Sequence, residues 1–263
     1  MIVDGKAIAA DILRSVKERL QGKTLTVRAI VMAPTAVTES YLRIKEKRAS
    51  EAGMQLEVVR MEHDAQTEDI IAKIALPGAD AVIVQLPLPD HIDTKRVLDS
   101  IPLTKDADLL SDAARERFVD EGIIPPVAEA VREILERYEI DVPNAKAIVI
   151  GDGWLVGKPV ADLLHRMGAQ VVVLTKDSPY FADFDEADII VSGAGQPHMV
   201  KPDILGPWPV LIDAGTSELG GAIAGDMDPA CAENARLFTP VPGGVGPVAV
   251  ACLFRNVAEL AGK

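Results

Sequence analysis

Short, nearly uninterrupted aliphatic segments alternate with longer amphipathic ones along this chain of 263 residues. Residues 81–84 read Ala-Val-Ile-Val, without a polar position, which is typical of a strand buried on both faces of a parallel sheet. Apolar residues recur every four positions from Ile8 to Leu20, which predicts an amphipathic helix that Gly22 can end. The alternation favours an α/β fold with right-handed crossovers.

The same alternation of strands and helices continues to the end of the chain, and one segment rich in Gly and Pro divides it into two parts. Strands are expected at 27–33, 56–61, 80–89, 146–151, 170–174, 187–193 and 209–215, and further helices at 40–53, 67–76, 125–138, 153–168 and 246–262. Gly and Pro cluster in residues 118–126, where Pro126 suits the first turn of a helix. We therefore place a domain boundary near residue 120, between domains 1–120 and 121–263.

The charge composition of the chain restricts the classes of partner that it can bind. Asp and Glu total 40 against 27 for Lys and Arg, so the formal charge is −13. Such a surface disfavours nucleic acid and an anionic membrane, because both require clustered cations. No apolar run reaches the roughly 18 residues that span a bilayer, and the N-terminus does not read as a signal peptide. Neither the cysteines, Cys231 and Cys252, nor the histidines have metal-ligand spacing, so we expect no metal and a cytoplasmic protein.

A glycine-rich turn joins the strand at 146–150 to the next helix. Gly151, Gly153 and Gly157 have the spacing G-x-G-x-x-x-G. A turn without side chains lets a dinucleotide diphosphate approach the backbone and the amino end of a helix. The same glycines also suit a plain strand-to-helix turn. Asp177, just past the following strand, suits a ribose-binding acid and a solvated loop acid equally well.

Four further motifs carry a resemblance. They are Y-x-x-x-K-x-K at 41–47, V-Q-L-P-L-P at 84–89, K-D-A-D at 105–108 and T-P-V-P-G-G-V-G-P at 239–247. In this order, and with the glycine turn, the whole chain resembles the bifunctional methylenetetrahydrofolate dehydrogenase/cyclohydrolase family. The proline-containing motifs at 84–89 and 239–247 are the specific ones.

The resemblance implies a fold and two reactions. It implies two α/β domains, an N-terminal folate-binding catalytic domain and a C-terminal Rossmann-like dinucleotide-binding domain, with helix 246–263 returning to the first. It implies a homodimer that oxidises 5,10-methylenetetrahydrofolate with NAD(P) and hydrolyses the methenyl product to 10-formyltetrahydrofolate.

It also implies roles for residues on the folate side. Lys45 would transfer protons and activate water, Gln85 would set its protonation state, and Asp108 would bind the pterin. Tyr41, four positions before Lys45 and so on the same helix face, would stack on the aminobenzoyl ring. Further substrate-binding positions by the same match are Leu86, Pro87, Pro242, Gly243 and Gly244. Without the resemblance, Lys45 reads as an exposed lysine in a charged run and Asp108 as a loop acid.

On the cofactor side the match is weaker. It implicates Gly151, Asp152, Gly153, Trp154, Val156, Gly157, Lys176, Gly193 and Thr216. The family usually has G-R-S at the turn, where this chain has Asp152 between two glycines. An acid there would repel a 2′-phosphate and favours NAD, whereas Lys176 can bind phosphate and favours NADP. Leu109 also replaces the glycine expected after Asp108.

Three alternatives stay open. The first is a cyclohydrolase with weak or lost dehydrogenase activity, since hydrolysis needs mainly Lys45, Gln85 and water. The second is a non-catalytic protein of the same fold that binds folate or a nucleotide. The third, a different NAD-dependent dehydrogenase, has no use for the motifs at 84–89 and 239–247 together.

Overall fold

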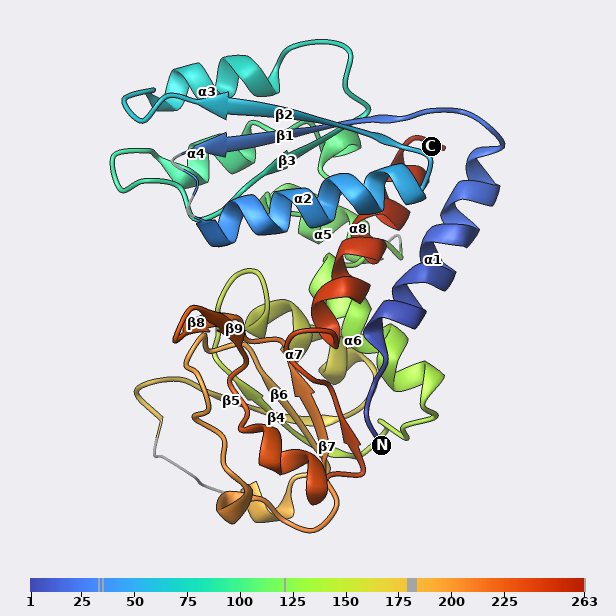
Figure 1. Ribbon diagram of the computed structural model, residues 1–263, viewed down its shortest axis with the longest axis vertical. Helices are drawn as coiled ribbons and strands as arrows, with labels where there is room; N and C mark the ends of the chain where they lie inside the picture. Colours follow the sequence, from blue (N-terminus) through green and yellow to red (C-terminus); the bar gives the residue numbers. More distant parts are fainter. Residues whose placement is uncertain (33, 35, 121, 179–183, 263) are drawn as a thin grey trace. The chain divides into compact units, whose positions relative to one another are not determined.

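The computed structural model describes residues 1–32, 34, 36–120, 122–178 and 184–262. By contacts between residues the chain forms two compact units (Figure 1). The folate-motif unit comprises Ala10–Pro126 and Val250–Lys263, and the glycine-turn unit comprises Met1–Ala9 and Val127–Ala249. The boundary near residue 120 stays a prediction. No helix formed by the described residues is long and apolar enough to span a membrane.

The folate-motif unit contains a three-stranded parallel sheet with the order β2-β1-β3. These strands are β1 (Thr26–Met32), β2 (Gln55–Met61) and β3 (Ala81–Val84). The helices are α2 (Ala36–Glu51), α3 (Thr67–Ile74), α4 (Thr94–Asp99) and α5 (Asp112–Asp120), preceded by α1 (Gly5–Leu20), which starts in the other unit. β1 lies in the middle of the sheet, and apart from the buried Arg28 its residues from Val27 to Met32 are apolar and buried.

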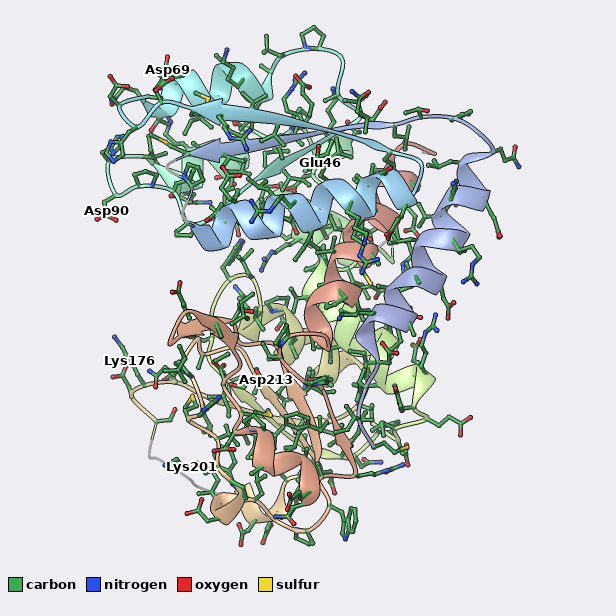
Figure 2. The ribbon with its side chains drawn as sticks, in the orientation of Figure 1. Glu46, Asp69, Asp90, Lys176, Lys201 and Asp213 are labelled. Carbon is green, nitrogen blue, oxygen red and sulfur yellow. The ribbon has the colours of Figure 1, made fainter. Side chains whose placement is uncertain are left out.

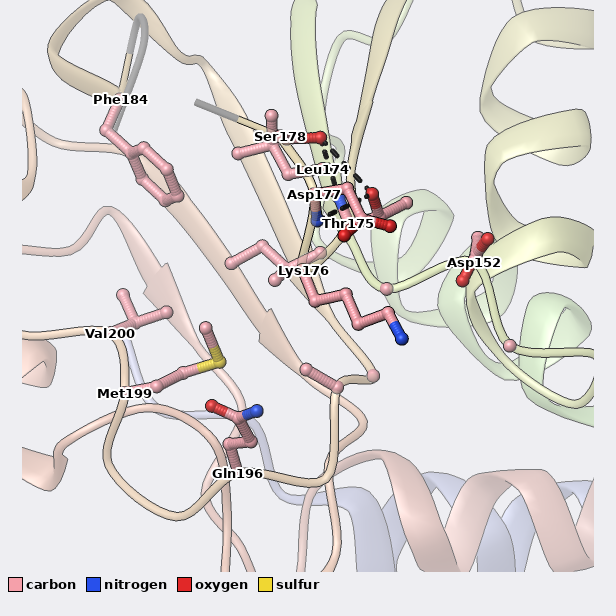
Figure 3. A pocket seen from close by; sticks show the side chains of 15 residues that line it. Asp152, Leu174, Thr175, Lys176, Asp177, Ser178, Phe184, Gln196, Met199 and Val200 are labelled. Carbon is pink, nitrogen blue, oxygen red and sulfur yellow. Dashed lines mark hydrogen bonds between the residues drawn. The ribbon is translucent and has the colours of Figure 1, made fainter. Parts of the chain in front are cut away.

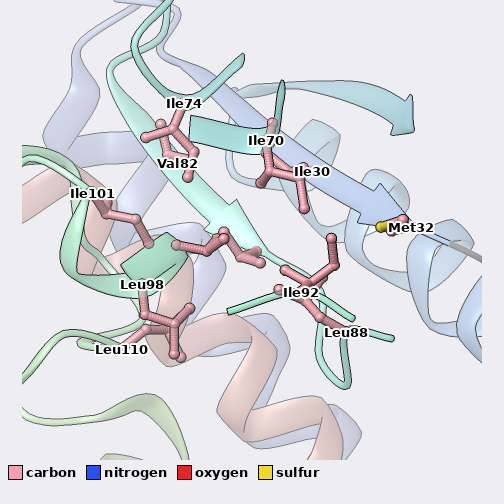
Figure 4. Packing of buried hydrophobic residues seen from close by; sticks show 12 residues of the cluster. Ile30, Met32, Ile70, Ile74, Val82, Leu88, Ile92, Leu98, Ile101 and Leu110 are labelled. Atoms are coloured by element: carbon pink, nitrogen blue, oxygen red, sulfur yellow. The ribbon is translucent and has the colours of Figure 1, made fainter. Parts of the chain in front are cut away.

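Side-chain alternation along β1 explains that burial, because successive residues of a strand point to opposite faces. Ile30 and Met32 pack with α3 and α4 residues on one face of the sheet (Figure 4). Ala29 and Val31 pack with Leu42 of α2 on the other face. The sheet is therefore covered by helices on both sides, as the uninterrupted apolar strands predict.

The glycine-turn unit contains a five-stranded parallel sheet with the order β10-β7-β6-β4-β5. Its strands are β4 (Lys146–Ile150), β5 (Gln170–Leu174), β6 (Ile189–Ser192), β7 (Val210–Asp213) and β10 (Leu237–Phe238). The helices are α6 (Pro126–Arg137) and α7 (Gly157–Arg166), and α7 contacts β4, β5 and β6. The strand order reverses beside β4, which is the usual ligand position in an open α/β sheet. The predicted α/β fold is confirmed.

Several elements differ from the sequence prediction. β3 ends at Val84, not at residue 89, and α2 begins at Ala36, four residues before the predicted start. The prolines after β3 cannot donate to a sheet, which explains the early end. The short helices α4 and α5, the hairpin of β8 (Ser217–Leu219) and β9 (Ala222–Ala224), and β10 carry too few residues to show a periodicity. The last position of the predicted strand 27–33 lies outside the described residues.

The last helix, α8 (Val245–Leu260), starts in the glycine-turn unit and ends in the folate-motif unit. The buried Asn256 donates hydrogen bonds from Nδ2 to the carbonyl oxygens of Ala107 (3.0 Å) and Ile124 (2.9 Å). The return of this helix to the first domain is thereby confirmed, and it fixes the backbone on one side of Asp108.

Between β4 and α7 the turn needs glycine for a packing reason. A Cβ on Gly157 would lie 1.9 Å from the carbonyl oxygen of Gly151, while a Cβ on Gly153 would meet no atom within 4 Å. Gly151 itself has φ +95°, a conformation that side chains disfavour. Gly157, the first residue of α7, therefore packs directly against the backbone of Gly151, which follows β4.

We expect Gly157→Ala to lower the free energy of unfolding by about 1–3 kcal/mol, since the added methyl must displace backbone. Gly153→Ala is the matched control and should change it by about 0.5 kcal/mol or less. Urea unfolding of the ligand-free proteins measures both. Equal stabilities of the two variants would contradict the close approach.

Candidate active site

Lys45 lies on α2 and Gln85 directly follows β3, and their side chains meet. Nζ of Lys45 donates a hydrogen bond to Oε1 of Gln85 at 3.0 Å, and Nε2 of Gln85 donates to the Leu86 carbonyl at 3.0 Å. The second bond orients the amide so that its oxygen faces the lysine. The backbone N–H of Gln85 also bonds to the carbonyl of Ile30 in β1 (2.9 Å), which anchors the residue to the sheet.

The electrostatics of Lys45 differ from those of an exposed lysine. Burial lowers the pKa of the Lys45 ammonium, and the negative charge of Asp108 partly restores it. Burial raises the pKa of Asp108, while the positive charges of Lys45 and Arg115 oppose that rise. A lysine, a carboxylate and an amide are therefore coupled in one unit, which suits a group that exchanges protons with a substrate.

The segment that carries Asp108 is tightly held. The buried carboxylate of Asp106 accepts bonds from the backbone N–H of Leu110 (3.0 Å) and from the N–H and hydroxyl of Ser111 (both 2.9 Å). Leu109 has φ +52° and is fully buried, so it adopts the conformation for which the family uses glycine. Its carbonyl accepts a bond from Nε of Arg115 at 2.8 Å. The loop geometry thus tolerates leucine.

The other folate-side predictions fall in different places. Tyr41 lies in α2, but its side chain lies outside the described residues. Leu86 is half-buried and Pro87 is exposed, directly after Gln85. Pro242, Gly243 and Gly244 belong to the glycine-turn unit, where Gly244 donates its N–H to the carbonyl of Pro240 at 2.7 Å.

The glycine-turn unit contains a pocket of about 630 Å³ at the carboxyl ends of its strands. Figure 3 shows the residues that line it, which follow β4, β5 and β6. Gly151, Asp152 and Gly153 form one side, residues 174–178 a second, and Gly193, Ala194 and Gln196 a third. This place, at the reversal of strand order beside a glycine turn, fits a dinucleotide. No described side chain caps α7 at Val156, so its amino end suits an anionic group.

Three charged residues line this pocket, two acidic and one basic, with opposite consequences for a ligand phosphate. Asp152 and Lys176 line it (Figure 3), and both are exposed. Figure 2 also shows the side chain of Lys176. Lys176 projects from a turn that is closed locally, because the N–H of Thr175 donates to the Ser178 hydroxyl at 2.9 Å. Asp177 lines the pocket as well, on the same turn.

Four predicted cofactor residues do not line the pocket. The side chain of Val156 packs against the backbone of Gly193. A Cβ added at Gly193 would lie 2.4 Å from Cγ1 of Val156. Trp154 stacks under Lys158, whose Nζ lies 5.2 Å from the ring centroid, and Gly157 is buried. Thr216 is exposed, just before β8.

The sequence reasoning missed several lining residues. They are Ile150, Leu174, Thr175, Ser178, Phe184, Ala194, Gln196, Met199 and Val200. Their shared signal is position, since most lie at or just after the carboxyl ends of predicted strands. Phe184, Met199 and Val200 come from irregular segments that no local pattern marks.

Two family models match most of the chain, one toward each end. Residues 3–108 match the model "Tetrahydrofolate dehydrogenase/cyclohydrolase, catalytic domain". Residues 125–263 match "Tetrahydrofolate dehydrogenase/cyclohydrolase, NAD(P)-binding domain". The bifunctional protein FolD of Halothermothrix orenii is 34% identical over 98% of this chain and 96% of its own length. That of Thermus thermophilus is 33% identical over 99% and 95%.

Solved structures agree with these matches. The bifunctional FolD enzyme of Campylobacter jejuni superposes with a TM-score of 0.93 at 29% identity, covering 100% of this chain and 98% of its own. The Trypanosoma brucei enzyme, solved with NADP and an inhibitor, gives a TM-score of 0.93 at 30% identity, covering 100% and 97%. With both domain models and near-complete coverage by relatives, the chain belongs to the tetrahydrofolate dehydrogenase/cyclohydrolase family.

Proposed function

We propose that this protein oxidises 5,10-methylenetetrahydrofolate to the 5,10-methenyl cation with a nicotinamide dinucleotide and then hydrolyses the cation to 10-formyltetrahydrofolate. The observation that carries the proposal is the Lys45–Gln85 pair, coupled electrostatically to Asp108. The pocket of the glycine-turn unit supports the dinucleotide part. The Campylobacter jejuni and Trypanosoma brucei enzymes described above carry both activities in their names.

In this proposal Lys45 moves the protons of the hydrolysis. Water adds to the methenyl carbon and loses one proton, which leaves a neutral hydroxyl adduct. The hydroxyl of the adduct then loses its proton as the bond from that carbon to N5 breaks and N5 takes up a proton, so the formyl group stays on N10 and one proton is released overall. An amine whose pKa is lowered by burial can accept and return that proton. Gln85 accepts from Nζ and so orients the amine, while Asp108 supplies the opposing negative charge.

Binding roles follow from chemistry and from the family match. The Asp108 carboxylate suits the adjacent N–H donors of a pterin, and Tyr41 would stack on the aminobenzoyl ring. Leu86 and Pro87 would line the same site, and the loop of Pro242, Gly243 and Gly244 would approach the folate closely.

The dinucleotide would be held by the pocket of the glycine-turn unit. Gly151 and Gly153 of the glycine turn would face its diphosphate and Gly193 its nicotinamide half, since all three line the pocket. When bound, the dinucleotide accepts a hydride from the methylene carbon of the folate. Trp154, Val156 and Gly157 would act by shaping the turn, and Thr216 by its place beside β8.

The cofactor preference would be decided by Asp152 and Lys176. We propose that Asp152 shifts the preference from NADP toward NAD, because its charge lies on the glycine turn where a 2′-phosphate would be repelled. Lys176 opposes this shift from the other side of the pocket. A cyclohydrolase with weak dehydrogenase activity is the second candidate, favoured by a complete Lys45–Gln85 pair next to an altered glycine turn.

Assembly and location complete the proposal. We propose a homodimer, supported by the unpaired edge of β5, where Val172 and Val173 are 50% and 38% exposed. Sedimentation should then report twice the chain mass of 28.0 kDa. We place the enzyme in the cytoplasm, where the free thiols of Cys231 and Cys252 stay reduced and where 10-formyltetrahydrofolate would supply purine biosynthesis.

We expect Lys45→Met to lower cyclohydrolase kcat about a hundredfold or more, because the proton-transfer group is lost. Lys47→Met is the matched control, since Lys47 is exposed on the same helix. The decay of methenyltetrahydrofolate absorbance measures both. If wild type and Lys45→Met are equally inert, the protein binds folate without catalysis.

The pH dependence tests the coupling of Lys45 to Asp108. Asp108 raises the pKa of Lys45, so Asp108→Asn should lower that pKa further, and Lys45 would lose its proton at a lower pH. The limb of the kcat profile that reports Lys45 should therefore move to lower pH. The cyclohydrolase assay at saturating substrate measures it, and a shift to higher pH, or none, would refute the coupling.

Dehydrogenase assays with both dinucleotides test the preference. We expect wild type to use NAD at least as efficiently as NADP. Asp152→Arg should raise the ratio of kcat/KM for NADP over NAD about tenfold or more, since a charged hydrogen bond replaces a repulsion. Asp162→Arg makes the same charge change on an exposed position of α7 outside the pocket. A strong preference for NADP in wild type, with no gain from Asp152→Arg, would count against the shift.

A further inference from the structure

Asp226 is fully buried, and its carboxylate accepts hydrogen bonds from the last residue of β6 and from the loop that follows β6. Oδ2 accepts from the Ser192 hydroxyl (2.7 Å) and from the backbone N–H of Ala194 (2.8 Å) and Gly195 (3.2 Å). Oδ1 accepts from the N–H of Gln196 (2.8 Å). Three successive amides of one loop thus converge on one side chain about 30 residues away in sequence.

The backbone around Asp226 holds the rest of the same loop. The Gly225 carbonyl accepts from the N–H of His198 (3.0 Å) and the Asp226 carbonyl from that of Val200 (3.0 Å). Val200 also forms a parallel bridge with Met227. Residues 194–200 are therefore fixed by Asp226 and its neighbours through side chain and main chain together. Ala194, Gln196, Met199 and Val200 of this stretch line the pocket.

The protein interior around Asp226 has space for this carboxylate and for the carboxylate of Asp213. A Cβ on Gly215 would lie 2.1 Å from Cγ of Asp226, so only glycine leaves the space. Asp213 at the end of β7 accepts from the backbone N–H of Asp226 (3.1 Å), Met227 (2.8 Å) and Gly215 (3.0 Å). Burial, with a smaller effect of Asp226, raises the pKa of Asp213 to about 6.

These hydrogen bonds to Asp226 determine which groups of the pocket wall are available to bind a ligand. The amides of residues 194–196 point inward to Asp226, so they are not available to a ligand phosphate. The groups that remain available for phosphate binding are those of the glycine turn and the amino end of α7. The pocket wall formed by residues 194–200 has a shape that depends on the buried carboxylate of Asp226.

We propose that Asp226 is a positioning residue for the dinucleotide: it holds residues 194–200 in the shape that the cofactor contacts. This inference rests on the proposed function, because it assumes that the pocket binds NAD or NADP. Asp226 itself touches no ligand, and its effect reaches the cofactor through Ala194, Gln196 and Met199.

Asp226→Asn tests the proposal with almost no change of volume. An amide has one acceptor oxygen, so whichever way it turns its NH2 group must face backbone N–H donors, and at least one loop bond is lost. Calorimetric titration with NAD and with NADP, well below the melting temperature, should show Kd for the preferred dinucleotide raised about tenfold or more. Dehydrogenase KM for the dinucleotide should rise in parallel, with cyclohydrolase kcat unchanged.

Asp106→Asn is the matched control. Asp106 is an equally buried carboxylate with three donors, but it lies in the folate-motif unit, so its replacement should reduce stability without changing the dinucleotide Kd. Ser192→Ala is a milder second variant that removes one donor to Asp226 and should raise Kd a fewfold.

The outcomes separate this inference from the function on which it rests. A lower melting temperature with unchanged Kd in Asp226→Asn would overturn the positioning role. If Asp226→Asn does not fold, Ser192→Ala decides, and an unchanged Kd there would overturn it as well. A wild-type protein that binds neither dinucleotide would instead refute the proposed dehydrogenase, while cyclohydrolase activity tests the remaining half.

Discussion

The central strands of both sheets are buried on both faces, and this one constraint places the polar chemistry of the molecule. A strand such as β3 or β6 has no exposed face on which a charged side chain could lie. Apart from Arg28 of β1, which is buried and bonded to Glu57 and to the carbonyls of Leu76 and Pro77, the polar groups of the candidate sites lie where the strands end. Gln85 follows β3, the glycine turn follows β4, Thr175 follows β5 and Gly193 follows β6.

The charged groups that are buried near these ends each need a local partner. The Lys45 ammonium has the amide oxygen of Gln85 and the charge of Asp108. Asp106 and Asp226 have backbone amides and a serine hydroxyl each. Since an unpaired buried charge is strongly unfavourable, these contacts fix loops as well as neutralise charge. The two units use the same device, a buried carboxylate that gathers successive backbone amides.

The resemblance to a known family was most informative where side chains do chemistry. It paired Lys45 with Gln85, and the two side chains are hydrogen-bonded in the structure. It was less informative on the cofactor side, where Trp154, Val156 and Thr216 do not line the pocket. Trp154 and Val156 lie within the glycine turn, where Trp154 contacts Lys158 and Val156 packs against Gly193, while Thr216 is exposed just before β8. Met199 and Phe184, which do line the pocket, come from irregular segments without any periodic signal.

The sequence by itself determined the order of strands and helices, the α/β class and the place of the glycine turn. Each of these depends on residues close together in the chain, namely apolar periodicity and the absence of side chains at a bend. The tertiary structure alone decided which polar residues are buried and what they meet. Asn256 bound to two distant carbonyls and Asp226 beneath the pocket wall both depend on backbone brought together from far apart in sequence. Hydrogen bonding of that kind is set by packing geometry, which local sequence patterns do not encode.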